Sequence, residues 1–143
     1  MKFFQKWNPK SIKEFVSNHK SELLNGNLKI EQTINKTNPD FIAVLEYRKT
    51  EEGGRSTFAK SGYRPAIKFP FSKMQTSGAQ KFIDKDFVWP GETVEAEIRI
   101  LSVDFFKNQL SENLKFDFRE GDRIIGTGKI IKITNPILDS ASR

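Results

Sequence analysis

From Thr93 to Ile100 of the segment TVEAEIRIL, apolar side chains occupy every second position. The apolar set is Val94, Ala96, Ile98 and Ile100, and the positions between them hold Glu95, Glu97 and Arg99. A period of two places the apolar set on one face of a β-strand and the charged set on the other. The segment therefore predicts a strand with one face in a core and one face in solvent.

Five further segments predict strands: residues 28–34, 41–47, 66–71, 114–119 and 123–133. The segment 41–47 is apolar on both faces, which is typical of a buried barrel strand. Pro70 lies within 66–71 and predicts an edge strand or a bend. Glycine, proline and polar turns separate these short segments, so the chain predicts an all-β antiparallel barrel or sandwich. Its thirteen phenylalanines would fill a small, curved core.

Residues 9–24 predict the one helix of the chain, in an N-terminal arm over 1–38. The apolar residues at helical spacing are Ile12, Phe15, Val16, His19, Leu23 and Leu24. Asn8 suits the N-cap and Pro9 the first turn. His19 is interpreted as a packed side chain, since no second metal ligand accompanies it. Residues 134–143 predict a frayed tail.

Charge and composition narrow the range of functions that the chain could have. The 143 residues carry a net charge of +6. Residues 40–143 hold 17 basic and 15 acidic residues, a difference of only +2. A nearly neutral barrel is weak support for nucleic-acid binding. The absence of cysteine excludes disulfides, thiolate metal sites and cysteine nucleophiles. The sequence shows neither a signal peptide nor a membrane span, which predicts a cytoplasmic protein.

Two motifs resemble nucleotide-binding signatures and are rejected. GDRIIGTG, residues 121–128, has the glycine spacing of a phosphate loop, but the lysine that should follow is missing. NKTN, residues 35–38, lacks the final aspartate of the guanine-specificity motif. With one histidine and no recognisable nucleophile, the sequence predicts no catalytic residue, no metal site and no cofactor.

Turn chemistry accounts for most glycines and two of the prolines. Pro90-Gly91 suits a tight turn, because glycine supplies the positive φ of a type II turn. Gly126 and Gly128 predict a bulge or a close approach of backbone. The full set of predicted structural turn residues is Gly53, Gly54, Gly62, Pro65, Pro90, Gly91, Gly121, Gly126 and Gly128.

Three motifs occur in a recognisable order between Pro39 and Ile133. They are DFIAVLEYRKTEEGGRSTFAKSGYRPAIKF, FVWPGETVEAEIRI and LKFDFREGDRIIGTGKIIKI. Together they resemble the C-terminal (third) domain of elongation factor Tu and related translation GTPases. The resemblance implies a six-stranded antiparallel barrel of Greek-key type over 39–133, standing alone without a GTPase domain. No GTP binding is expected.

The resemblance also implies partners, since in the full-length factor this domain meets the T-arm of tRNA, the GTPase domain and the exchange factor. The near-neutral barrel favours a non-catalytic module. We expect its partner to be a protein of the translation machinery. The alternative is an RNA-binding module that contacts tRNA through the Glu52-Gly53-Gly54-Arg55 loop. Its candidate contacts are Arg55, Lys60, Arg64 and Lys73.

Two departures from the family pattern concern this RNA surface. The family's histidine after the loop arginine is Ser56 here, and the loop at residues 70–78 is remodelled. A third interpretation of the arginines is structural, with local hydrogen bonds to Glu51 or Glu52.

Overall fold

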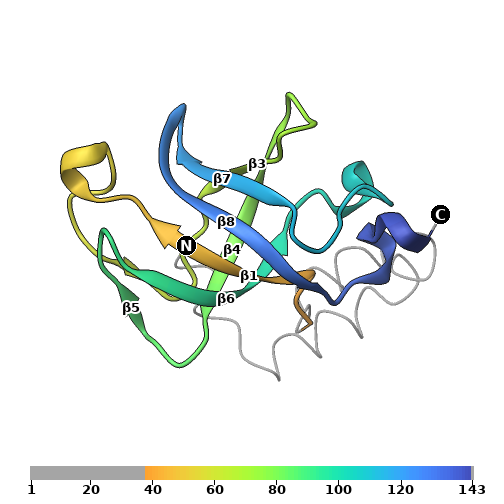
Figure 1. The fold of residues 1–143 in the computed structure, drawn as a ribbon, viewed down its shortest axis with the longest axis horizontal. Coiled ribbons are helices and arrows are strands. Elements are labelled where there is room, and N and C mark those ends of the chain that lie inside the picture. Colours follow the sequence, from red (N-terminus) through yellow and green to blue (C-terminus); the bar gives the residue numbers. More distant parts are fainter. Residues whose placement is uncertain (1–37, 143) are drawn as a thin grey trace, which may run out of the picture. The chain divides into compact units, whose positions relative to one another are not determined.

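A computed structural model describes residues 38–142 (Figure 1). The predicted helix at 9–24, the predicted strand at 28–34 and His19 lie outside the described residues. Within residues 38–142, no helix is long and apolar enough to cross a membrane.

Six strands form a closed antiparallel barrel, in the order β1-β6-β4-β3-β7-β8 with β8 paired back onto β1. Their bounds are β1 Phe41–Tyr47, β3 Ala66–Lys68, β4 Gln75–Phe82, β6 Thr93–Ile100, β7 Lys115–Glu120 and β8 Arg123–Ile133. A separate ribbon pairs β2 Ala59–Lys60 with β5 Phe87–Val88. Strands that are distant in sequence are neighbours, as the Greek-key barrel requires, and the predicted fold class is confirmed.

The periodicity of β1, β6 and β8 gave their bounds correctly to within one residue. In β6 the four predicted inward residues are all buried. In β1 the alternate positions Phe41, Ala43, Leu45 and Tyr47 are buried, while Ile42 and Val44 are half-buried. The strand therefore has one core face and one partly covered face.

The sequence analysis missed β4, residues Gln75–Phe82. Its inward positions carry Thr76, Gly78 and Gln80 before Phe82, and all four are buried. These residue types give no hydrophobic alternation, so the pattern is invisible to a search for apolar periodicity. The predicted strand at 66–71 ends early, at Lys68, and lies between β4 and β7 rather than at an edge. The chain then turns, and Ser72 N–H donates to the carbonyl of Phe69 at 3.2 Å.

Phenylalanine rings fill the barrel, and two glycines of β8 make room for them. The ring centroids of Phe41 and Phe116 lie 5.8 Å apart, and those of Tyr47 and Phe118 lie 5.0 Å apart. A Cβ at Gly126 would lie 2.2 Å from Cζ of Phe118. A Cβ at Gly128 would lie 2.3 Å from Cζ of Phe116. The rings of β7 therefore lie directly against bare backbone of β8.

The register between β7 and β8 shifts beside these glycines, since Phe118 faces Gly126 and Arg119 faces Ile124. The extra residue on β8 is the buried Ile125. A bulge bends a strand and increases its twist, which helps six short strands to close.

The segment after β8 packs onto the barrel, so the expectation of a frayed tail is wrong for residues 134–142. Short 3₁₀ turns occupy Pro136–Leu138 (η4) and Ser140–Ser142 (η5). Leu138 is fully buried, and Leu110 bridges to Asp139. The buried carboxylate of Asp40 accepts from the Asn135 side chain at 2.9 Å and from the backbone of Ile100 at 2.8 Å. Backbone hydrogen bonds add to these contacts, such as the one from Leu110 N–H to the carbonyl of Leu138 at 2.8 Å. Together they hold a segment that has no periodic pattern.

We expect Gly126→Ala to lower the free energy of unfolding by about 1–3 kcal/mol, because the added methyl collides with the Phe118 ring. Urea denaturation measures the change. The exposed neighbour Thr127→Ala is the matched control and should stay within about 0.5 kcal/mol of wild type. Combining Gly126→Ala with Phe118→Leu should recover part of the loss, and strictly additive losses would contradict the packing described here.

Candidate functional site

The segment 51–65 begins within the 3₁₀ turn η2, Thr50–Glu52. This turn follows the end of β1 by two residues. Gly53 ends η2 with φ +101°, and Gly54 N–H donates to the carbonyl of Lys49 at 2.9 Å. A Cβ at Gly54 would lie 2.0 Å from the carbonyl oxygen of Arg48. Only glycine fits under that carbonyl. Gly53 and Gly54 together therefore determine the path of the loop.

Arg55 points into the protein rather than into solvent. Its guanidinium forms an ion pair with Glu120 at the end of β7, 65 residues away in sequence. The same guanidinium lies 4.6 Å above the ring of Tyr63, and Nη2 donates to the carbonyl of Phe58 at 3.3 Å. The side chain of Arg55 is only 19% exposed. The predicted partners Glu51 and Glu52 are therefore wrong for Arg55, whose acidic partner is Glu120.

Glu120 gathers three donors at this corner of the barrel. Tyr63 donates its hydroxyl to Oε2, and Arg123 donates to Oε1 at 2.9 Å. Partial burial raises the pKa of this carboxyl, but the hydrogen bonds from Tyr63 and Arg123 and the charge of Arg55 outweigh it, so the pKa of Glu120 is lowered. Burial and the hydrogen bond to Glu120 raise the pKa of Tyr63. The cluster is thus a carboxylate held ionised by its neighbours, and it ties the 51–65 loop to the β7–β8 hairpin.

A second buried polar pair lies inside the barrel. The hydroxyl of Tyr47 donates to the side-chain oxygen of Gln80, which is fully buried. Burial is the main cause that raises the pKa of the Tyr47 hydroxyl, and the nearby Tyr63 raises it further. The backbones of Gln80 and Tyr63 also form an isolated antiparallel β-bridge. The pair orients β1 against β4 and presents no reactive group to solvent.

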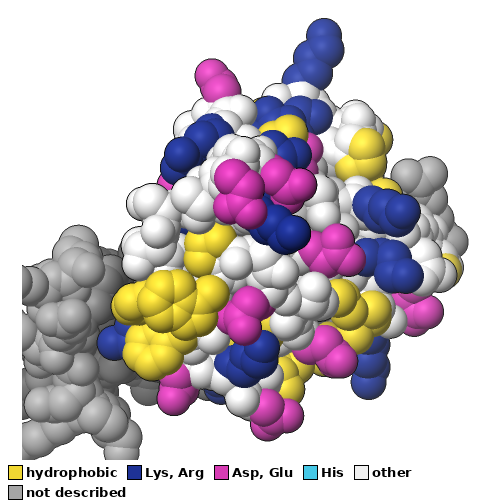
Figure 2. Space-filling view, turned by 60° about the vertical axis from the view of Figure 1, so that its left-hand side comes forward, with side chains coloured by type: hydrophobic (Ala, Val, Ile, Leu, Met, Phe, Trp, Pro, Cys, Tyr) yellow, Lys and Arg dark blue, Asp and Glu magenta, His cyan; other side chains and the backbone are white. Residues whose placement is uncertain are grey.

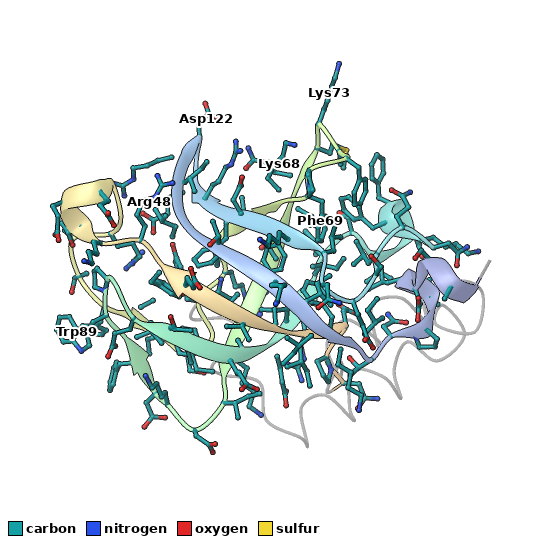
Figure 3. All side chains as sticks on the ribbon, in the orientation of Figure 1. Arg48, Lys68, Phe69, Lys73, Trp89 and Asp122 are labelled. Carbon is teal, nitrogen blue, oxygen red and sulfur yellow. The ribbon has the colours of Figure 1, made fainter. Side chains whose placement is uncertain are left out.

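The other three predicted contact cations are exposed. Lys60 lies on β2, Arg64 lies between Tyr63 and β3, and Lys73 lies in the β3–β4 connection. Figure 3 shows Lys73 at the tip of that connection, well away from η2. Because Lys73 lies apart, the four residues do not all converge on one phosphate-sized site.

Of the predicted turn residues, Pro90 and the glycines lie at turns or at close approaches, whereas Pro65 directly precedes β3 and is in no turn. Positive φ angles occur at Gly53, Gly62, Gly91 and Gly121. Pro65 is buried, and Pro90 precedes Gly91 in a turn closed by Glu92 N–H donating to the carbonyl of Trp89 at 3.0 Å. Within residues 38–142, no group of three or more acidic, histidine or cysteine residues could hold a metal ion.

An exposed aromatic surface, which we define as Phe58, Phe87 and Trp89, was not predicted. The rings of Phe87 and Trp89 are 47% and 55% exposed. Both lie edge-on to Phe58, with centroid distances of 4.9 Å and 5.1 Å. Figure 2, which brings the β5 side of the barrel forward, shows hydrophobic side chains gathered in a patch on this face, and Figure 3 shows Trp89 projecting from it.

A signal for this surface is present in the sequence. Val88 is buried between Phe87 and Trp89, so period two in FVW places both aromatic rings outward. Two other exposed aromatic residues differ from this surface, because each packs against a buried phenylalanine of the core. Phe71 stacks on the buried Phe69 at 5.7 Å, and Phe105 lies edge-on to the buried Phe106 at 5.4 Å.

We expect Glu120→Gln to lower the free energy of unfolding at neutral pH by about 1 kcal/mol, a small effect because the ion pair is partly solvated. The folded pKa of Glu120 is depressed, so its stabilising contribution is complete above the unfolded value of about 4.3. That contribution is lost as the pH falls through the folded pKa.

The gap between variant and wild type should therefore narrow when urea denaturation is repeated at a pH below about 4.3 instead of at neutral pH. The exposed Glu112→Gln is the matched control, and no comparable gap should appear at either pH. A Glu120→Gln gap that stays constant from neutral to acid pH would contradict the ion-pair role.

The fold and the loop geometry agree with one comparison to known families. A family model described as "Elongation factor Tu C-terminal domain" matches residues 34–134. The match covers the whole barrel, the 51–65 loop and the β7–β8 hairpin. The chain belongs to the elongation factor Tu C-terminal domain family, whose members are β-barrel modules related to translation.

Proposed function

We propose that this chain is a non-catalytic binding module of the translation machinery, and that its aromatic surface binds a protein partner. The exposure of Phe87 and Trp89 carries the proposal. Exposed aromatic residues that contact one another rather than the core are typical of interaction sites, and tryptophan is enriched among the residues that dominate binding energy. Cytoplasmic localisation and the absence of GTPase activity belong to the same proposal.

The backbone that carries Trp89 is held by a hydrogen-bonded turn, which favours binding. The turn that follows Trp89 is closed by the backbone bond to Glu92, and the Glu92 carboxylate accepts from the Trp89 N–H at 2.8 Å. Gly91 N–H donates to the carbonyl of Tyr47 at 2.9 Å and anchors the turn to β1. A preordered anchor loses little conformational entropy on association.

Charge around the surface is mixed, which favours a protein over a polyanion. Lys60 faces Phe87 across the β2–β5 ribbon, and Asp86 precedes Phe87. Lysine and aspartate at the margin of an aromatic centre resemble the polar rim of a protein interface.

The RNA alternative through the Glu52-Gly53-Gly54-Arg55 loop has less support. The guanidinium of Arg55 is already occupied by Glu120, Tyr63 and Phe58. A phosphate at this loop would have to displace a carboxylate whose own pKa is lowered by the contact. RNA binding there stays a prediction of the resemblance.

Site-specific photo-crosslinking tests the proposal. A benzophenone amino acid at Lys60, beside the aromatic surface, should give a protease-sensitive adduct with a protein of the translation machinery. Adding Phe87→Ser and Trp89→Ser should reduce the adduct at least tenfold, since both rings leave the surface. The same crosslinker at Lys132, exposed on β8, serves as the positional control.

Nuclease-sensitive adducts at Lys60, or an equal yield in the double variant, would contradict the proposal. The two serine changes affect exposed side chains, so urea denaturation should show the barrel still folded.

A further inference from the structure

The aromatic surface is the outer face of the β2–β5 ribbon, and the strand register determines its layout. Ala59 is paired with Val88, and both side chains are buried. Side chains alternate along a strand, so the neighbours of these two residues point outward. The outward residues form two opposed pairs, Lys60 with Phe87 and Phe58 with Trp89. Three aromatic rings and one ammonium group therefore share this face.

The rings form one stepped apolar surface rather than a cage. The ring of Phe58 lies at 85° to that of Phe87 and at 62° to that of Trp89. Rings that contact one another leave no space between them for a quaternary ammonium group, and the charge of Lys60 repels a cation. The face therefore suits an uncharged apolar group and disfavours a basic ligand.

Two polar groups on the same face have no partner within residues 38–142. The backbone N–H of Trp89 is bonded to Glu92, but its indole N–H donates to none of these residues. The ammonium of Lys60 likewise forms no ion pair with them. A partner that excludes water here must supply an acceptor for the indole, because a buried donor without one loses its hydrogen bond to water. A carboxylate of the partner would complement Lys60.

An α-helix or an added strand meets these needs poorly. The carbonyls in the middle of a helix are bonded within the helix and leave no acceptor for the indole. The β2–β5 ribbon is only two residue pairs long, and the carbonyl of Lys60 already accepts from Tyr63 N–H at 3.0 Å. Its edge therefore offers little to a further strand. A polyproline II segment differs from both, since its backbone carbonyls have no internal partner.

We propose that the aromatic surface binds a proline-rich segment of its protein partner, in the polyproline II conformation and with an acidic residue at one end. The proline rings pack on Phe87 and Trp89, and one carbonyl of the segment accepts from the indole N–H of Trp89. The acidic residue lies at the Phe87 end, because Lys60 is opposite Phe87. A polyproline II segment is ordered before it binds, so it loses little entropy. This assignment rests on the proposed function, because it names the kind of segment that the same surface takes.

The test is an NMR titration of the indole N–H signal of Trp89 in an isotope-labelled Trp7→Phe variant, in which Trp89 is the one tryptophan left. The probe is a synthetic oligoproline that ends in glutamate. The signal should move downfield and saturate, because the indole gains an acceptor. A glycine–serine peptide of equal length and charge is the control. It should bind about tenfold more weakly, because it lacks the proline rings and the preordered backbone.

Substitutions in the protein locate the contact. Phe87→Ser should weaken binding of the oligoproline about tenfold, whereas Phe105→Ser, which changes a similarly exposed ring elsewhere, should leave it unchanged. Wild type should prefer the oligoproline that ends in glutamate over one that ends in glutamine by about threefold. Lys60→Gln should remove this preference, and the exposed Lys85→Gln should keep it. The two peptides are compared on one folded variant, so this result does not depend on the ring substitution.

A Trp89 signal that stays in place, or that moves equally with the glycine–serine peptide, would overturn the assignment. So would a single-stranded RNA that moves the same signal and displaces the oligoproline, because the face would then be a platform for stacked bases.

The titration needs no cellular partner, so its outcome is separable from that of the crosslinking experiment. A protein adduct at Lys60, with an oligoproline that neither binds nor competes, would overturn the proline-rich segment and leave the proposed function in place. Oligoproline binding without a protein adduct would instead support the recognition chemistry and contradict a partner from the translation machinery.

Discussion

Closure of the barrel depends on the contact between the phenylalanine rings of β7 and the bare backbone of β8. Phe116 and Phe118 point inward from β7, and Gly128 and Gly126 lie directly beneath them. Without side chains at these glycines, the rings reach the centre and meet Phe41 and Tyr47 of β1. These two ring contacts thus link the β7–β8 hairpin to β1, the strand that closes the barrel on β8.

The same hairpin determines what the loop arginine can do. Glu120 ends β7, and its position follows from the register that the glycines allow. From there its carboxylate takes the hydrogen bonds of Arg55 and Tyr63 and fixes the 51–65 loop to the barrel. An arginine that resembles a phosphate contact in sequence is thus used for the fold. The proposed partner binding rests instead on exposed groups such as Trp89.

Much of this fold can be read from the sequence, because β1, β6 and β7 bury apolar side chains at every second position. The strand β4 cannot be found in that way, since its buried positions hold threonine, glycine and glutamine whose fit depends on neighbours such as Ile67 and Tyr47. The prediction of a frayed tail was wrong for a related reason, because the tail is held by the buried Leu138, by the buried Asp40 and by backbone hydrogen bonds, none of which leaves a periodic pattern.

The candidate site was predicted less well than the fold. The sequence identifies Arg55 as a residue of interest, but its partner lies 65 residues away and can be named only once the strand register is known. Trp89 and Phe87 could have been identified from the alternation around Val88.

A double-mutant cycle between Arg55 and Glu120 is the most direct test of the claim that the loop arginine serves the fold. The free energy of unfolding is measured for wild type, Arg55→Met, Glu120→Gln and the double variant. We expect a coupling energy of about 1 kcal/mol, because each single change already breaks the ion pair. The contradicting result is a double variant that loses the sum of the two single losses, to within about 0.3 kcal/mol. That result would show that the two side chains act independently, and Arg55 would then be free to contact a partner.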